Sequence, residues 1–233
     1  MFKKLSVLIP VYNEEKTIKK CIDRVLSANT LKMDLEIIVS DNNSTDSTKE
    51  ILKSIKDPRV KLLFKEKNEG KGSNIKNALS QATGDIILFQ DADLEYSPES
   101  FEDLLNPFFQ NEADVVYGSR LTKSKPTRIM GFPNYLGNIV ITFIANFLYN
   151  KIFSDIATGY KVFKKDIIKN LNITADGFEI EPEITAKISK MKNLNIIEVP
   201  ISIFSRSYED GKKVRWWHFF TYLYHLLKWR FVS

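Results

Sequence analysis

The chain has 233 residues, of which 43% are hydrophobic, and a formal net charge of +5. This length fits one domain, or one domain with an appendage, around a substantial core, and a single cysteine excludes an internal disulfide. The mild positive charge suits anionic partners such as phosphates or lipid headgroups, whereas the sequence contains no motif typical of nucleic-acid binding. The apolar run that ends at Pro10 is too short for a secretory signal, which favours the cytoplasm.

Short apolar runs alternate with helical patterns through the first half of the chain. Because the expected strands are continuously apolar, the pattern predicts an α/β fold with a mainly parallel sheet that helices flank on both faces. The last helix of this half begins at Ser97-Pro98, a typical N-terminal pair. The expected strands are 5–9, 36–40, 60–64, 86–89 and 114–117, and the expected helices are 14–28, 47–55, 71–82 and 98–109.

The second half is less regular and begins with a basic loop at 119–133. Residues 129–150 carry no charge, and their number could span a membrane. Internal glycine, proline and asparagine favour instead a helix that lies on a surface or at a bilayer interface. The remaining patterns predict a strand at 158–163, a helix at 181–191 and a strand at 194–203.

The C-terminal segment 214–231 is unusually rich in aromatic residues, and its apolar positions recur at helical spacing. Lysine and arginine residues flank it at both ends, which is typical of a helix at a membrane interface. The alternative is a helix that packs on the core or on a second subunit. We favour the membrane, and we expect a catalytic domain at 1–210 followed by this interfacial or packing helix at 211–233.

Three acids follow the expected strand 86–89, namely Asp91, Asp93 and Glu95. Neighbouring carboxylates repel one another, and a bound cation relieves that repulsion. Hard oxygen ligands favour Mg²⁺ or Mn²⁺ over zinc, and the two histidines both lie in the C-terminal segment. The sequence therefore predicts a divalent metal site here, against the alternative of a solvated acidic loop.

Other polar groups also follow expected strands, where α/β sheets bind ligands. The ring of Tyr12 could lie against a base and Glu14 could bind sugar hydroxyls, with a capped helix start as the alternative. Asp41 could accept a ring N–H from uracil or guanine, although taken alone its segment favours a polar turn before a helix. Arginine and lysine bind phosphate oxygens. As a set, the cations of the later loops suggest more than one phosphate: Arg120, Arg128, Arg206, Lys212 and Lys213.

Over nearly its whole length the chain resembles the family 2 inverting glycosyltransferases of the GT-A fold, and within them the dolichyl- and polyprenyl-phosphate sugar synthases. Two features depart from that pattern: Asn42-Asn43 replaces a common Asp-Gly, and the transmembrane helices of many such relatives are missing. The matching segments are Ile9-Pro10-Val11-Tyr12-Asn13-Glu14, Asp41 with Ser44-Thr45-Asp46, Gly70-Lys71-Gly72, Asp91-Ala92-Asp93-Leu94, Gly118-Ser119-Arg120, Asp155 with Thr158-Gly159-Tyr160-Lys161, Glu198-Val199-Pro200, and Arg206 with Gly211-Lys212-Lys213.

The resemblance implies a role for each matching position. The nucleoside would be held by Pro10, Tyr12, Glu14 and Asp41. Asp91 would lie by the ribose and diphosphate, and Asp93 would ligate the metal with help from Glu95. The donor diphosphate would be steadied by Arg206 and Lys212, and an acceptor phosphate gripped by Arg120 and Arg128. Asp155 would lie near the acceptor.

The implied reaction moves a hexose from a UDP- or GDP-sugar, with inversion, to a polyprenyl (dolichyl or undecaprenyl) phosphate on the cytoplasmic face of a membrane. A lipid phosphate is already anionic and needs no general base. If the acceptor is instead a saccharide or glycan-precursor hydroxyl, a base is needed, and Asp155 is the candidate. A non-catalytic nucleotide-binding protein at the membrane is the third possibility.

Overall fold

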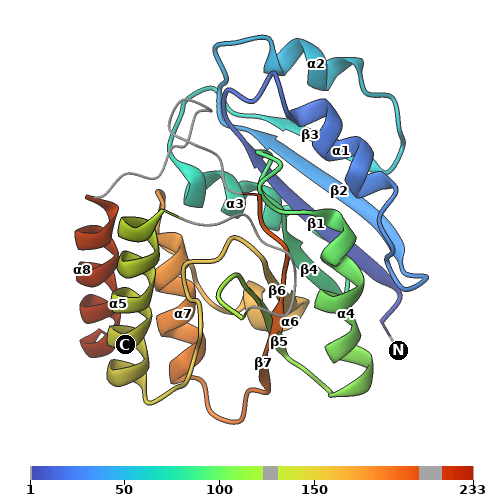
Figure 1. The fold of residues 1–233 in the computed structure, drawn as a ribbon. Coiled ribbons are helices and arrows are strands. Elements are labelled where there is room, and N and C mark those ends of the chain that lie inside the picture. The colour runs from blue at the N-terminus through green and yellow to red at the C-terminus, as the bar shows by residue number, and fades with distance from the viewer. Residues whose placement is uncertain (1, 123–130, 205–216, 233) are drawn as a thin grey trace.

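The computed structural model describes residues 2–122, 131–204 and 217–232. Its centre is a seven-stranded sheet in the order β3-β2-β1-β4-β6-β5-β7, with helices on both faces (Figure 1). The strands are β1 (Lys4–Val11), β2 (Asp34–Asp41), β3 (Val60–Phe64), β4 (Ile86–Phe89), β5 (Val115–Ser119), β6 (Lys161–Lys164) and β7 (Ile196–Pro200).

The sheet is mainly parallel, as the sequence predicts. β1 pairs in parallel with β2 and β4, β2 with β3, and β5 with β7. β6 is the exception, because it runs antiparallel to both β4 and β5. The helices are α1 (Ile18–Leu26), α2 (Thr48–Ser54), α3 (Lys71–Ser80), the 3₁₀ turn η1 (Pro98–Ser100), α4 (Phe101–Gln110), α5 (Phe132–Tyr149), α6 (Lys165–Lys169), α7 (Ile180–Lys190) and α8 (His218–Phe231).

Alternation along each strand sends side chains to two separate cores. Leu5 and Val7 of β1 join α1, α2 and α4 in one hydrophobic cluster, whereas Leu8 of the same strand joins α3, α5, α7 and α8 in the other. All three side chains are fully buried. Burial on both faces explains why the strands read as continuous apolar runs.

The α5–α8 pair forms the outer layer on the second face, next to α7 (Figure 1). Tyr149 of α5 donates a hydrogen bond from its hydroxyl to the Leu226 carbonyl of α8, at 2.7 Å. α8 packs on the core through Tyr222, Leu226 and Trp229, which are all buried. None of the described helices combines the length and hydropathy that crossing a bilayer requires.

Some element boundaries differ from the sequence-based expectation. The first helix begins at Ile18 instead of residue 14, because Asn13 takes a left-handed φ of 49° and the chain turns before the helix starts. β6 begins at Lys161 instead of residue 158, because the preceding Gly159 turns to donate its N–H to the Tyr96 hydroxyl at 2.7 Å. The five-residue helix α6 has no counterpart among the elements expected from the sequence.

Candidate functional site

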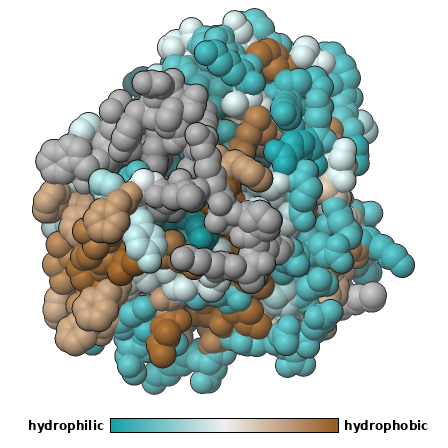
Figure 2. Space-filling view, viewed as in Figure 1, coloured by the Kyte–Doolittle hydropathy of each residue, from teal (hydrophilic) through white to brown (hydrophobic). Residues whose placement is uncertain are grey.

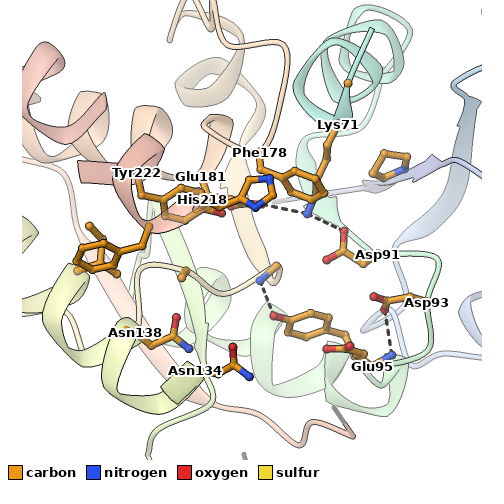
Figure 3. Close-up of a pocket in the computed structure, with 18 of the residues that line it drawn as sticks. Lys71, Asp91, Asp93, Glu95, Asn134, Asn138, Phe178, Glu181, His218 and Tyr222 are labelled. Atoms are coloured by element: carbon orange, nitrogen blue, oxygen red, sulfur yellow. Dashed lines mark hydrogen bonds and ion pairs between the residues drawn. The ribbon is translucent and has the colours of Figure 1, made fainter. Parts of the chain in front are cut away.

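A cleft of about 1130 Å³ opens at the carboxyl ends of β1 and β4. One wall comes from the segments after these strands and from the N-terminus of α3, and the opposite wall comes from α5, α7 and α8 (Figure 3). The connection after β1 leads outward to β2, whereas β4 lies on the other side of β1. Such a reversal of strand order leaves a crevice at the strand ends, where open α/β sheets bind ligands.

The acidic segment after β4 forms part of the cleft floor. Asp91, Asp93 and Glu95 all line the cleft, as the sequence suggests. The Asp93 carboxylate accepts a hydrogen bond from the Glu95 backbone N–H at 3.0 Å. Between them Leu94 has a φ of 63°, a left-handed conformation that few residues other than glycine adopt. The sharp turn at Leu94 thus keeps two successive carboxylates near the cleft.

The carboxylates suit a metal that is shared with a ligand. Within the described part of the chain, no three His, Cys, Asp or Glu side chains converge closely enough to hold a metal ion by themselves. Mg²⁺ and similar hard cations are commonly bound by one or two carboxylates together with substrate phosphates and water. Asp91 and Asp93 supply such a partial set of oxygen ligands at the edge of a cleft with room for a diphosphate.

A partly buried charge network extends from Asp91 into the wall of the cleft. The Lys71 ammonium lies 2.8 Å from Asp91 Oδ1 and 3.1 Å from Glu181 Oε1 (Figure 3). Burial by itself would lower the pKa of Lys71, but the charges of Asp91 and Glu181 more than offset this effect and raise it well above its ordinary value. Glu181 also pairs with the fully buried Lys161. Lys71 therefore remains a cation that holds the Asp91 carboxylate in place.

The segment after β1 supplies the predicted nucleoside-binding residues. Pro10, Tyr12 and Glu14 line the cleft. Glu14 is nearly buried, and its carboxylate accepts a hydrogen bond from the Thr17 hydroxyl at 2.7 Å. A hydrogen-bonded carboxylate beside an aromatic ring and a rigid proline provides both a flat surface and an acceptor.

Asp41 lies deeper than the cleft lining, fully buried at the end of β2. Its Oδ2 accepts the Ser44 backbone N–H at 3.1 Å, whereas its Oδ1 is buried and finds no hydrogen-bond donor among the described residues. A buried acceptor without a donor is costly unless a ligand or water supplies one. Asn42 next to it lines the cleft, so a nucleobase N–H is one donor that could reach this region.

The departure at Asn42-Asn43 has a structural counterpart. Asn43 adopts a left-handed φ of 60°. Asparagine tolerates this conformation better than most residues other than glycine. The turn after β2 can therefore form in this chain, although Asn43 stands where the resembling family commonly has glycine.

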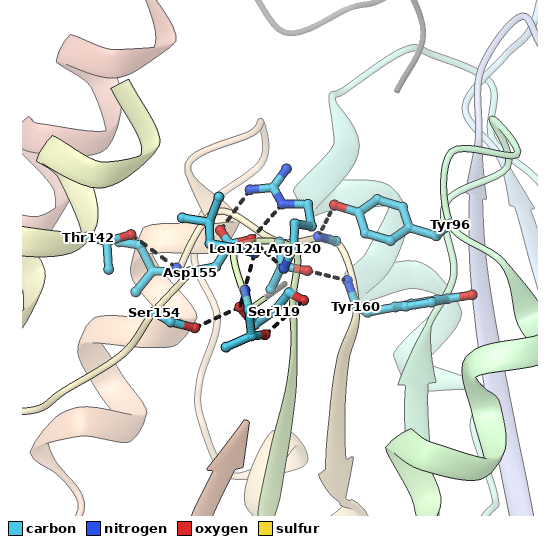
Figure 4. A network of polar contacts seen from close by, with 12 residues as sticks. Tyr96, Ser119, Arg120, Leu121, Thr142, Ser154, Asp155 and Tyr160 are labelled. Carbon is cyan, nitrogen blue, oxygen red and sulfur yellow. Dashed lines mark hydrogen bonds and ion pairs between the residues drawn. The ribbon is translucent and has the colours of Figure 1, made fainter. Parts of the chain in front are cut away.

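Arg120 and Asp155 form a bidentate ion pair (Figure 4). Arg120 Nε donates to Asp155 Oδ2 at 2.6 Å, and Nη2 donates to Oδ1 at 2.7 Å. Asp155 is fully buried, and Arg120 lines the cleft. Burial would lower the pKa of Arg120, but Asp155 more than compensates and raises it. Since both carboxylate oxygens are engaged, the geometry favours Asp155 as a residue that positions Arg120 over a role as base.

Glu198 of β7 supports this pair from below. Its carboxylate accepts the Ser154 backbone N–H at 2.9 Å and the Asp155 backbone N–H at 3.3 Å. Burial raises the pKa of Glu198. The Ser154 hydroxyl in turn donates to the Ser119 hydroxyl at 2.7 Å, which ties the loop before β6 to the end of β5. Asp155 thus holds Arg120, and its loop is in turn anchored by Glu198 of β7 and Ser119 of β5.

The structure therefore brings together most of the predicted site residues. Those that line one cleft are Pro10, Tyr12, Glu14, Asp91, Asp93, Glu95 and Arg120. Asp41 and Asp155 are buried beside it. Arg128, Arg206, Lys212 and Lys213 lie outside the described residues.

Sequence reasoning assigned no role to Lys71 or Glu181, although both line the cleft. Lys71 occurs in the segment Gly70-Lys71-Gly72, and the two glycines let the backbone of this helix start lie against residues 175–177, where added Cβ atoms would meet carbonyl oxygens at 2.4 Å. The two glycines could therefore have indicated from the sequence that Lys71 lies at a closely packed helix start. Nothing in the sequence around Glu181 distinguishes it from an exposed helical acid.

Comparison with known proteins places these features in a family. Residues 6–171 match the family described as glycosyl transferase family 2. The dolichol-phosphate mannosyltransferase of Pyrococcus furiosus is 27% identical over 97% of this chain, and the chain spans 64% of that protein's length. The UDP-N-acetylglucosamine–dolichyl-phosphate N-acetylglucosaminyltransferase of Methanococcus voltae is 28% identical, and the match covers 97% of this chain and 95% of that protein.

A solved structure supports the fold. The glucosyl-3-phosphoglycerate synthase of Mycobacterium tuberculosis, crystallised with Mn²⁺, UDP and phosphoglyceric acid, superposes with a TM-score of 0.74. The superposition covers 99% of this chain and 80% of that one, at 19% sequence identity. At this identity the likeness establishes the GT-A fold alone.

Proposed function

Because the chain belongs to glycosyl transferase family 2, we propose that it transfers a hexose from a UDP- or GDP-sugar to a polyprenyl phosphate, with inversion at the sugar C1. The proposal depends most on one observation: Asp91 and Asp93, after β4, line the same cleft as the Tyr12 and Glu14 segment after β1. One nucleotide-sugar could therefore place its nucleoside on the first segment and its diphosphate, with a metal ion, at the second.

Several residues would hold the donor. The nucleoside would lie against Pro10 and Tyr12, with Glu14 and the unsatisfied Asp41 oxygen as acceptors. Lys71 would neutralise charge near the diphosphate from its place beside Asp91. The sequence adds Arg206 and Lys212 as further diphosphate ligands.

Asp91, Asp93 and Glu95 would hold a divalent cation, Mg²⁺ or Mn²⁺. When bound, the cation would stabilise the charge that grows on the leaving diphosphate. The crystallised relative from M. tuberculosis contains Mn²⁺ together with UDP, which supports this assignment.

The acceptor assignment has two supports. The names of both archaeal relatives specify a dolichyl phosphate acceptor. In this chain the cleft wall opposite the acids carries apolar side chains, among them Leu136, Ile141 and Phe219, beside polar ones such as Asn134 and Asn138. The apolar side chains would suit an isoprenoid. Arg120, with Arg128 from the sequence, would orient the acceptor phosphate. Such an acceptor resides in a bilayer, so the chain would work peripherally on the cytoplasmic face of a membrane.

The proposed reaction is one displacement. An acceptor phosphate oxygen forms a bond to C1 while the bond from C1 to the diphosphate oxygen breaks, and the nucleoside diphosphate leaves with the bonding electrons. The anionic acceptor has no proton to lose, so no base is needed. Asp155 would serve by holding the Arg120 guanidinium at the position where it meets the acceptor.

The test is transfer from a panel of UDP- and GDP-sugars, with Mn²⁺ or Mg²⁺, in the presence and absence of a polyprenyl phosphate. We expect lipid-dependent release of one nucleoside diphosphate. Asp93→Ala should lower it by at least about a hundredfold, since charge stabilisation at the reacting centre is lost. Asp23→Ala, an exposed acid on α1, is the matched control.

If the release of nucleoside diphosphate does not depend on lipid, the acceptor would be a saccharide or water instead of a polyprenyl phosphate. Failure to bind any nucleoside diphosphate with Mn²⁺ would refute the enzyme assignment altogether.

A further inference from the structure

One face of α5 is an exposed apolar stripe. Phe132, Leu136, Ile139, Phe143 and Phe147 follow one another at spacings of three or four residues, so they share one side of the helix. Phe143 is 69% exposed and Phe147 is 81% exposed. The opposite side of α5 packs on the core through Ile141 and Ala145.

α8 repeats the same pattern. Phe220, Tyr224, Leu227 and Phe231 stand at the same helical spacing, and each is more than two-fifths exposed. Its buried residues, such as Leu226, occupy the other side. Both helices are therefore apolar on their inner and their outer faces.

The two stripes adjoin because α5 packs against α8. The space-filling view shows brown and tan side chains gathered over these two helices, whereas the surface over α1, α2 and α4 is mostly teal (Figure 2). Soluble monomers rarely expose a contiguous apolar area of this kind, and larger ones mark sites of contact with a protein or a membrane.

The charges on these two helices have one sign. Neither α5 nor α8 contains an acidic residue, and Lys228 and Arg230 lie in the last turn of α8. Lys151 follows α5 after Asn150. Cations next to exposed aromatic side chains are complementary to a surface that is apolar inside and negatively charged at its rim, as an anionic bilayer is.

The two-helix face is also continuous with the cleft. Leu136 and Phe220 belong to the stripes and line the cleft as well. A molecule in contact with the face could therefore reach the cleft along these two apolar side chains.

We propose that the outer face of α5 and α8 docks on an anionic lipid bilayer, with both helices lying in the membrane surface and the cleft opening toward it. The inference rests on the proposed function in that it explains how a membrane-embedded acceptor reaches the cleft. It assigns the contact to two helices far apart in the sequence.

A second copy of the chain fits this face less well. Symmetric pairs bring the same patch of both subunits together, so Lys228 and Arg230 would meet an equally cationic rim with no acid on either helix to pair with.

The test is co-sedimentation of the full chain with vesicles of phosphatidylcholine and phosphatidylglycerol, compared with phosphatidylcholine alone. We expect tighter binding to the anionic vesicles. The variant Phe143→Ser/Phe147→Ser/Tyr224→Ser/Phe231→Ser should bind at least about tenfold more weakly, since it removes apolar surface from the bilayer. Phe64→Ser/Phe109→Ser, which removes two exposed phenylalanines from other elements, should bind like the wild type.

Transfer to a short, water-soluble prenyl phosphate separates this inference from the proposed function. The four-residue variant should keep that activity while losing transfer to a polyprenyl phosphate embedded in vesicles. Wild-type protein that turns over the soluble acceptor without binding vesicles would overturn the docking face alone. So would a dimer in solution that the same variant dissociates. Vesicle binding without transfer to any lipid phosphate would refute the proposed function but would still support the docking face.

Discussion

Gly159 lies so close to the Asp91 carboxylate that a Cβ at this position would stand 2.4 Å from Asp91 Oδ2. The same added atom would stand 2.9 Å from the Tyr96 ring. The loop before β6 therefore fixes where the first acid of the Asp91–Asp93 segment can lie, although the two residues are far apart in the sequence.

We predict that Gly159→Ala lowers transfer activity by about tenfold to a hundredfold, because a displacement of about 1 Å at a reacting centre has effects of this size. The Asp91 carboxylate is a side-chain end that can move, so the fold should survive, as thermal unfolding would verify. Gly131→Ala is the control, since the nearest atom to an added Cβ there is 3.8 Å away. Unchanged kinetics in Gly159→Ala would mean that the position of Asp91 is not critical.

The Lys71 ammonium is predicted to contribute to donor binding. Lys71→Gln leaves Asp91 and Glu181 facing the cleft without their shared cation, so an anionic nucleotide meets a more negative site. We expect the affinity for UDP or GDP, measured by calorimetry with Mn²⁺, to fall by about tenfold, the effect typical of losing one charged hydrogen bond. Lys76→Gln on the same helix removes a partly exposed cation that pairs with Asp176 and should leave the affinity unchanged. Equal affinities for both variants would contradict the role of Lys71.

Asp155→Asn tests whether this carboxylate positions Arg120 or acts as a base. Removing one partner of a buried ion pair leaves an uncompensated charge, so the free energy of unfolding should fall by about 3 kcal/mol or more in urea titration. The more exposed pair of Arg59 and Asp57 offers a control, because Asp57→Asn should change stability little.

Under conditions where Asp155→Asn is folded, transfer to a polyprenyl phosphate should persist, with a raised KM for the acceptor. Complete loss of kcat at every pH, with the KM for the acceptor unchanged, would instead favour Asp155 as an essential base.

The stability of the fold should depend on pH through Glu36 of β2. Burial tends to raise the pKa of this carboxyl, but hydrogen bonds from Lys4, Ser6 and Thr83 lower it from 4.5 to about 2. The Thr83 backbone N–H, for example, lies 2.6 Å from Oε1. Since the pKa is lower in the folded state, the stabilisation is present above pH 4.5 and is lost as the pH falls toward 2.

Glu36→Gln should therefore be less stable than the wild type near neutral pH, by up to about 3 kcal/mol, and the difference should shrink on acidification. Urea titrations between pH 7 and pH 3 measure it. Glu50→Gln, an exposed acid on α2, should show no such convergence. A difference that stays constant with pH would attribute the loss to packing instead of charge.

Local patterns in the sequence were sufficient to predict much of the architecture. The apolar runs at 5–9 and 86–89 became β1 and β4, because strands buried on both faces must be apolar throughout. The Asp91–Asp93 pair after β4 was recognisable as a cleft segment, because ligands of parallel sheets bind at the strand ends.

The tertiary structure alone decided which distant residues meet and which faces stay exposed. Lys71 pairs with Glu181 because the start of α3 lies against residues 175–177, just before α7. Arg120 pairs with Asp155 because the loop before β6 is tied to the end of β5. Helical spacing in the C-terminal segment was visible in the sequence, but α8 is apolar on several sides. Only packing on α7 and α5 determined that Leu226 is buried and Phe231 exposed, because burial depends on the neighbouring element and not on the residue's own hydrophobicity.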